Sequence, residues 1–148
     1  DNIEDSMGHG RFVAFYLLCG TAAAFAQALP DPASEIPMIG ASGAISGVLG
    51  AYLILFPHAR VFVLIPIGFV FLSTIRASWL LLFWFGFQLL SGALSGVAGG
   101  GVAFWAHVGG FVAGMALILF MRDKSFRTRR PSRGSRVPRI QRRQGPWG

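Results

Sequence analysis

The stretch IPMIGASGAISGVLGAYLILF, residues Ile36–Phe56, decides how this chain folds. It contains no charged side chain, and its length suffices to cross a bilayer, since about 20 apolar residues span roughly 30 Å of hydrocarbon. Its glycines Gly40, Gly43, Gly47 and Gly50 recur at spacings of three and four, which puts small residues on one helix face. The stretch therefore predicts a membrane-spanning helix that packs closely against a neighbour.

Three further apolar segments, at residues 12–29, 77–94 and 102–121, suit the same role. Of the 148 residues 53% are hydrophobic and 13% are charged, and the apolar residues form blocks. We therefore predict an all-α fold, a polytopic membrane helical bundle with four transmembrane helices within a domain at residues 1–121. The segment Val61–Ile75 is short for a crossing and contains a proline and a glycine, so we predict an interfacial or partly embedded connection.

The basic residues predict the orientation of this bundle. Ten of the thirteen Lys and Arg residues lie within residues 122–143, and the others are Arg11, Arg60 and Arg76. If the four helices cross in alternation, all thirteen fall on one side of the membrane, and the positive-inside rule makes that side cytoplasmic. Residues 122–148 mix Arg with Pro, Ser and Gly, which predicts a disordered, Arg-rich cytoplasmic tail.

Lipids are the first partners that this composition predicts. The apolar helices require a lipid bilayer, and the basic tail attracts anionic lipid head groups, at about 1 kcal/mol per basic residue near the surface. The tail has no aromatic-interleaved base-binding pattern, so no nucleic acid is expected. We predict neither a metal nor another cofactor, because His9 and His58 lie apart at helix ends. The single Cys19 excludes a disulfide within the chain.

Two polar residues, Ser42 and His107, stand out inside the apolar segments. In an alternating topology the second and fourth helices run in the same direction, so both residues lie within about two turns of helix N-termini on one face. A serine hydroxyl becomes a good nucleophile when a neutral imidazole takes its proton. No Asp or Glu lies between Glu35 and Asp123, so the pattern predicts a catalytic dyad without an acid.

Glycines flank both candidate catalytic residues. Gly40 and Gly43 surround the serine, and Gly110 and Gly114 follow the histidine at helical spacing. Small residues at these positions allow the two helix backbones to approach, and free N–H groups at a helix N-terminus stabilise an oxyanion. We assign these four glycines to helix packing and the oxyanion site. In a membrane helix rich in small residues, a Gly-Xaa-Ser-Gly sequence is also a common packing motif, so the serine alone is weak support.

On these motifs the chain resembles the rhomboid family of intramembrane serine proteases. The matching pieces are Gly-Ala-Ser-Gly at residues 40–43, Ala-His-Val-Gly-Gly-Phe-Val-Ala-Gly at residues 106–114, and the opening Asp-Asn-Ile-Glu-Asp followed by Gly-His-Gly-Arg-Phe. The resemblance implies a helical-bundle endopeptidase that cleaves transmembrane protein substrates in or near their membrane segments. It implies Ser42 as the nucleophile and His107 as the general base and then acid. The expected location is the bacterial inner (plasma) membrane, with the C-terminus in the cytoplasm.

The chain departs from the family pattern in two ways. Rhomboids have a core of at least six helices, and this sequence resembles the third to sixth, so we expect a fragment that lacks the first two helices and part of the oxyanion site. Ser46 occupies a position where several family members have a tyrosine packed against the catalytic histidine. Tyr52 and Phe104 are the candidates to replace that ring.

Two alternative functions remain open at this stage. A non-catalytic rhomboid-like module that binds transmembrane helices explains the missing helices and Ser46, although such a role needs neither Ser42 nor His107. A small transporter or channel is disfavoured because the apolar segments carry no carboxylate for a proton or cation pathway.

Overall fold

The computed structural model describes residues 1–30, 32–33, 40–67, 69–95 and 103–123. A short helix α1 (Asn2–Met7) precedes the long helices α2 (His9–Ala28), α3 (Ser42–Leu55), α4 (Ala77–Ser95) and α5 (Phe104–Met121). Between α3 and α4 the chain forms two strands, β1 (Arg60–Ile67) and β2 (Phe69–Arg76). The predicted disordered tail lies outside the described residues, apart from Arg122 and Asp123.

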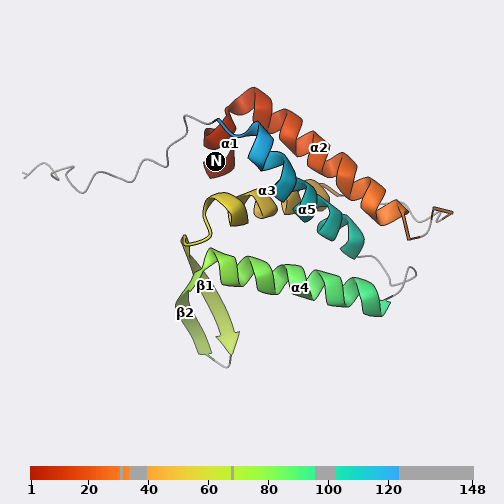
Figure 1. Ribbon diagram of the computed structural model, residues 1–148. Coiled ribbons are helices and arrows are strands. Elements are labelled where there is room, and N and C mark those ends of the chain that lie inside the picture. The colour runs from red at the N-terminus through yellow and green to blue at the C-terminus, as the bar shows by residue number, and fades with distance from the viewer. Residues whose placement is uncertain (31, 34–39, 68, 96–102, 124–148) are drawn as a thin grey trace, which may run out of the picture.

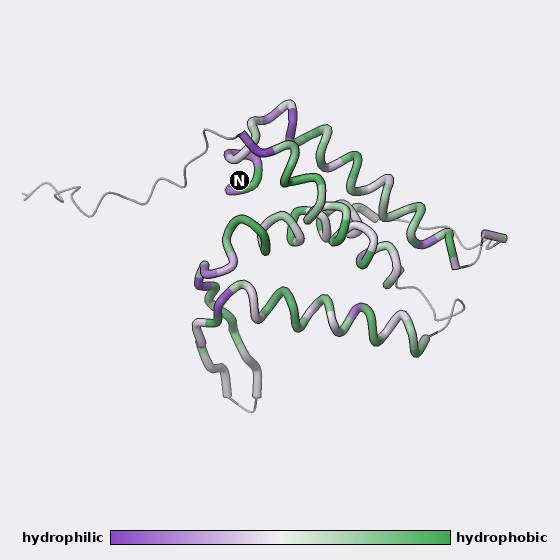
Figure 2. Tube along the Cα trace, in the orientation of Figure 1, coloured by the Kyte–Doolittle hydropathy of each residue, from purple (hydrophilic) through white to green (hydrophobic). Residues whose placement is uncertain are grey.

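Each of the four predicted segments contains a long helix, which confirms the all-α bundle (Figure 1). Three helices, α2, α4 and α5, are long and apolar enough to cross a membrane. Their surfaces are largely apolar, whereas polar residues gather at the end of the bundle where α1 lies and α4 begins (Figure 2). Most large apolar side chains on α4 are exposed, as expected for helices in contact with lipid rather than water.

The helix in the segment predicted at 36–56 is shorter than expected, which corrects that boundary. The helix α3 has 14 residues and begins at Ser42. Gly40 has a φ of 128°, a left-handed conformation that a glycine adopts without strain and that cannot belong to an α-helix. Residues 36–39 of the predicted helix lie outside the described residues.

The predicted connection between α3 and α4 is a β-hairpin, a structure that the sequence analysis did not anticipate. The strands β1 and β2 pair antiparallel from Arg60 opposite Arg76 to Ile67 opposite Phe69. Val, Ile, Phe and Thr dominate both strands, and these β-branched and aromatic residues favour extended backbone. The hydrophobicity of the segment was recognised correctly, but its strand propensity was overlooked.

The helices α3 and α5 pack almost backbone to backbone, as the glycines predicted. A Cβ atom added to Gly110 would collide with the carbonyl oxygen of Gly43, and one added to Gly114 would collide with that of Gly47. A Cβ atom on Gly47 would lie 2.5 Å from the sulfur of Cys19 in α2. Any side chain at these positions would push the helices apart. The contact therefore depends on glycine at several successive turns.

Larger side chains fill the interior of the bundle at the end where α3 and α5 finish, away from their N-termini. Ile3 and Met7 of α1 are buried there together with Phe15 and Ile118. The backbone N–H of Asp123 donates to the carbonyl of Ser6 at 2.9 Å, which ties α1 to the end of α5. The chain thus has a tightly filled hydrophobic end and an end at which small residues prevail.

The close contact of α3 and α5 predicts that the same change, from glycine to alanine, alters the stability of the protein by different amounts at two positions. Gly114→Ala places a methyl group against the backbone of α3, so we expect destabilisation of roughly 1–3 kcal/mol, typical of overpacking. Gly86→Ala, on α4, meets no atom within 4 Å and should leave stability unchanged or raise it by up to about 1 kcal/mol. Unfolding of both proteins by SDS in mixed micelles measures this, and equal effects of the two substitutions would contradict the packing described.

Candidate functional site

The structure brings Ser42 and His107 within hydrogen-bond distance at one end of the bundle. Ser42 is the first residue of α3 and His107 is the fourth of α5, and these helices run in the same direction (Figure 1). The Oγ atom of Ser42 lies 2.9 Å from Nε2 of His107. Both residues are within the predicted two turns of a helix N-terminus. The geometry required for proton transfer between them is therefore present.

Gln88, a residue that the sequence analysis did not single out, contacts the other side of the imidazole. Its Oε1 atom lies 2.9 Å from Nδ1 of His107, and the side chain is only 6% exposed. An amide oxygen accepts hydrogen bonds and does not donate them, so Nδ1 carries the proton in this arrangement. Nε2 is then the unprotonated nitrogen and accepts the hydroxyl proton of Ser42. Gln88 thus selects the tautomer in which His107 can act as a base.

The aromatic ring nearest His107 comes from α4. The ring centroid of Trp84 lies 5.8 Å from that of His107, at an interplanar angle of 40°. Neither residue proposed as a replacement for the family tyrosine takes this position in the ring contacts observed. Tyr52 packs instead against Phe56, at 5.0 Å between centroids. The expectation for Tyr52 is therefore wrong, and the ring observed beside His107 is that of Trp84.

Ser46, in the position of that tyrosine, has a local role. Its hydroxyl donates to the backbone carbonyl of Ser42 at 2.8 Å, and the residue is buried. This hydrogen bond occupies the backbone carbonyl of the candidate nucleophile Ser42.

The N-terminus of α5 is held by a side chain from α2. Ala103, at the cap position, offers no side-chain hydrogen bond, and the N–H groups of the first helical turn have no acceptor within the helix. Gln27 supplies one, because its Oε1 accepts the N–H of Ala106 at 3.1 Å. The residue after Ala106 is His107. Gln27 therefore fixes the turn from which the imidazole projects.

The four glycines assigned to the site divide into two groups. Gly43, Gly110 and Gly114 lie at the contact between α3 and α5, as predicted for helix packing. Gly40 lies before α3, and a Cβ atom there would meet only Ser42 Oγ, at 3.9 Å. The predicted place of Gly40 on the packed face of the helix is corrected, because α3 begins two residues later. Gly40 instead supplies the positive φ with which the chain enters the helix.

A pattern on α4 contained the signal for the residues that were missed. Leu81, Trp84 and Gln88 follow one another at spacings of three and four, so they share one helix face, and they are buried or half-buried. Trp79, Phe83 and Phe87 lie on the exposed face. An amide within an apolar helix and on the face of its inward-pointing residues needs a polar partner. His107 is that partner.

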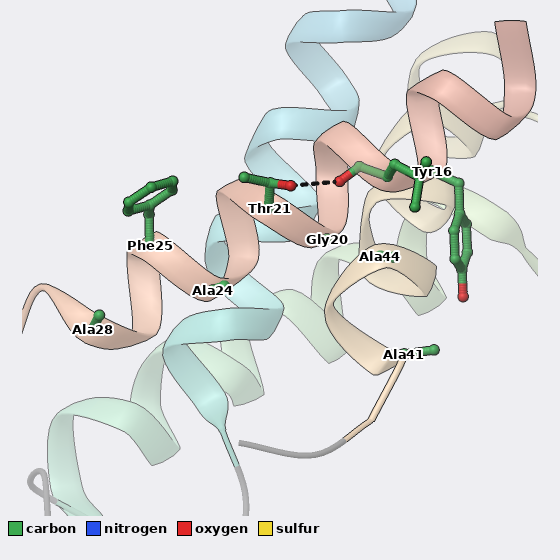
Figure 3. A pocket seen from close by; sticks show the side chains of 9 residues that line it. Tyr16, Gly20, Thr21, Ala24, Phe25, Ala28, Ala41 and Ala44 are labelled. Carbon is green, nitrogen blue, oxygen red and sulfur yellow. Dashed lines mark hydrogen bonds between the residues drawn. The ribbon is translucent and has the colours of Figure 1, made fainter. Parts of the chain in front are cut away.

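An open apolar groove lies beside the start of α3 (Figure 3). It is formed by α2 and the first turn of α3, and small residues make up most of its walls: Gly20, Ala24, Ala28, Ala41 and Ala44. The hydroxyl of Thr21 in this wall donates to the carbonyl of Leu17 in its own helix. The groove offers contact surface next to Ser42, and its walls contain neither dyad residue.

Comparison with known proteins supplies the family. The family model described as Rhomboid domain matches residues 1–124, which include all of the helices described above together with Ser42 and His107. No curated protein and no solved structure matches the sequence. Since the family match covers most of the chain, this protein belongs to the rhomboid family.

Proposed function

We propose that this chain carries the catalytic dyad of an intramembrane serine endopeptidase, with Ser42 as nucleophile and His107 as general base and acid. Rhomboid domains are generally those of serine intramembrane proteases, which act on transmembrane substrates in a bilayer. The main observation in support of the proposal is the 2.9 Å contact between Ser42 Oγ and His107 Nε2. The second contact, from Nδ1 to Gln88, supports it because it sets the tautomer that the reaction requires.

The geometry fits a two-step acyl transfer. Ser42 Oγ attacks the carbonyl carbon of the scissile peptide bond while its proton passes to Nε2 of His107. The resulting imidazolium keeps its Nδ1–H bonded to Gln88 and delivers the Nε2 proton to the leaving amine as the C–N bond breaks. Water then attacks the acyl ester, again losing its proton to Nε2, and the carboxylic acid product leaves as Ser42 recovers its proton.

The start of α3 supplies groups for the negative oxygen of the tetrahedral intermediate. The first hydrogen bond within this helix region runs from the N–H of Ile45 to the carbonyl of Ala41. The N–H groups of Ser42 and Gly43 precede it and have no acceptor in the helix. Together with the positive end of the helix dipole, they favour an oxyanion beside Ser42.

The setting of the reaction is a membrane. Three apolar helices and the rhomboid family membership indicate a membrane protein. We propose a rhomboid-like domain through residue 121 with the dyad near the non-cytoplasmic face, and a basic cytoplasmic tail that contacts anionic lipid head groups. A bacterial inner membrane fits this orientation, because every Lys and Arg then lies on the cytoplasmic side.

The groove on α2 favours a second candidate function, the binding of transmembrane helices without catalysis. Gly20, Ala24 and Ala28 are spaced by four residues, and such small residues allow the close approach of another helix. A binding module needs no activated serine. The two functions therefore differ in the reactivity of Ser42.

Loss of either dyad residue should abolish proteolysis. We expect Ser42→Ala and His107→Ala to lower cleavage of a transmembrane reporter by at least about 10³-fold, since the members of such a unit act together. The protein is expressed from its complete gene in membranes, and cleavage is followed by immunoblot. His58→Ala, which removes an exposed histidine, is the control and should cleave normally. Undiminished cleavage by the Ser42→Ala protein rules out the proposed mechanism.

Chemical labelling separates the protease from the binding module. A fluorophosphonate reacts with an activated serine, so the wild-type protein should become labelled and the Ser42→Ala protein should not. The His107→Ala protein retains the hydroxyl without its base and should react much more slowly. Wild-type protein that binds transmembrane helices but stays unlabelled would favour the binding module.

Gln88 should affect turnover through the orientation of His107. Gln88→Leu keeps the volume but removes the acceptor, and we expect kcat to fall about tenfold with little change in KM, as for loss of a hydrogen bond of about 1.4 kcal/mol. Gln88→Glu should restore much of the rate and move the acidic limb of the pH–rate profile to higher pH, because a carboxylate stabilises the imidazolium. A purely structural role for Gln88 predicts loss of folded protein and no such pH shift.

A further inference from the structure

The β-hairpin presents one face with a definite chemical pattern. Residues opposite one another across the two strands share a face, so Arg60 and Arg76 at the base are followed by Phe62 opposite Thr74 and Leu64 opposite Leu72. On this face, three large apolar side chains whose surroundings the structure describes are strongly exposed: Phe62 79%, Leu64 59% and Leu72 77%. The face thus combines two cations near the bundle with an apolar surface beyond them.

Neither water nor the hydrocarbon core suits this hairpin. An exposed apolar sheet face in water is an aggregation hazard. Deep in lipid, a different penalty applies. The sheet has two strands among the described residues, so the outer edge of each strand leaves backbone N–H and C=O groups unpaired, and each costs several kcal/mol in hydrocarbon. Both penalties are avoided in the interfacial layer, where backbone groups meet water and head groups while apolar side chains reach the acyl chains.

The attachment of the hairpin places it at the level of that layer. The N–H of Ala77 donates to the carbonyl of Ala59 at 2.7 Å, and the N–H of Ser78 donates to that of Pro57 at 3.3 Å. These bonds fix the hairpin base to the start of α4. The helix α4 is long and apolar enough to span the membrane from residue 77 onward. The hairpin base therefore lies where a spanning helix enters the bilayer.

The direction of the hairpin fits the same location. In Figure 1 the two strands project from the start of α4 across the axis of this helix rather than continuing it. If α4 runs roughly along the membrane normal, the strands run along the membrane surface. Eight residues per strand, at about 3.3 Å each, extend roughly 26 Å from the bundle.

We propose that the hairpin is an interfacial lipid anchor, with Phe62, Leu64 and Leu72 turned toward the acyl chains and Arg60 and Arg76 bound to anionic head groups. Two observations favour lipid over a second copy of the chain. The helix α4 begins directly after β2 and exposes Trp79 and Phe83, so both neighbouring elements present large apolar side chains to their surroundings. The paired arginines would repel those of a second copy in a symmetric contact, whereas they attract lipid phosphates.

Spin labelling of the full chain in lipid vesicles tests this orientation. Single cysteines at positions 62, 64 and 72, and at positions 63 and 73 on the opposite face as controls, are introduced in a Cys19→Ala background. Vesicles contain phosphatidylcholine with phosphatidylglycerol. We expect the ratio of collisions with oxygen to collisions with a water-soluble nickel chelate to be higher at the first three positions than at 63 and 73. The ratio should thus alternate with the strand period of two residues.

The other outcomes are distinct. Low ratios at all five positions place the hairpin in water, and high ratios at all five bury it in hydrocarbon, and either result overturns the proposal. Spin–spin broadening that disappears on dilution with unlabelled chain identifies a second copy as the occupant and also overturns it. Replacing Arg60 and Arg76 by Gln should lower the ratio at position 72 in the anionic vesicles, whereas Arg11→Gln, outside the hairpin, should leave it unchanged.

Discussion

The direct contact between the backbones of α3 and α5 sets the distance on which the candidate site depends. Ser42 and His107 are separated by 65 positions in the chain, and short polar groups meet across two helices only when the helix axes lie unusually close. Gly110 and Gly114 of α5 make this approach possible because a Cβ atom at either would strike the backbone of α3. A Cβ atom at Gly43 would strike Ala23 of α2 instead. The glycines therefore explain both the close packing of α3 against α5 and the short distance between Ser42 and His107. A sequence that lost the glycines would lose the 2.9 Å contact even if both polar residues remained.

Within the part of the chain that the structure describes, an amide rather than a carboxylate lies beside His107, and the apolar surroundings favour this choice. A buried carboxylate costs several kcal/mol in desolvation before any interaction repays it, and this cost is greatest in a membrane. The neutral amide of Gln88 can be buried with one good hydrogen bond, and it still holds the proton on Nδ1. A neutral amide stabilises an imidazolium less than a carboxylate anion would. The interaction with the imidazolium is therefore weaker, but the side chain that makes it can be buried in an apolar helix at a lower cost.

The sequence predicted the features that arise from spacing and from composition. The apolar segments predicted the long helices, the glycine spacing predicted the contact between α3 and α5, and the order of the polar residues predicted that Ser42 and His107 meet. Local conformation was harder to predict. The start of α3 depends on the positive φ of Gly40, and the hairpin depends on strand propensity within a segment judged by hydrophobicity alone. Gln27 was missed because its partner lies 79 positions away and nothing local identifies it. For Gln88 the helical spacing indicated an inward position, but its partner lies 19 positions away and no local pattern names it.

The two ends of the bundle are stabilised by different kinds of contact, and this difference bears on the site. At the end away from the dyad, Phe15 and Ile118 are fully buried and α1 closes the bundle, so dispersion and burial of large side chains hold the helices. At the dyad end, glycines bring α3 and α5 together, and single hydrogen bonds from Gln27 and Gln88 fix α5 and His107. Hydrogen bonds are directional, whereas apolar packing tolerates small shifts. Apolar packing at one end therefore leaves the geometry of the candidate dyad to be set by a few polar contacts, each of which orients a particular atom.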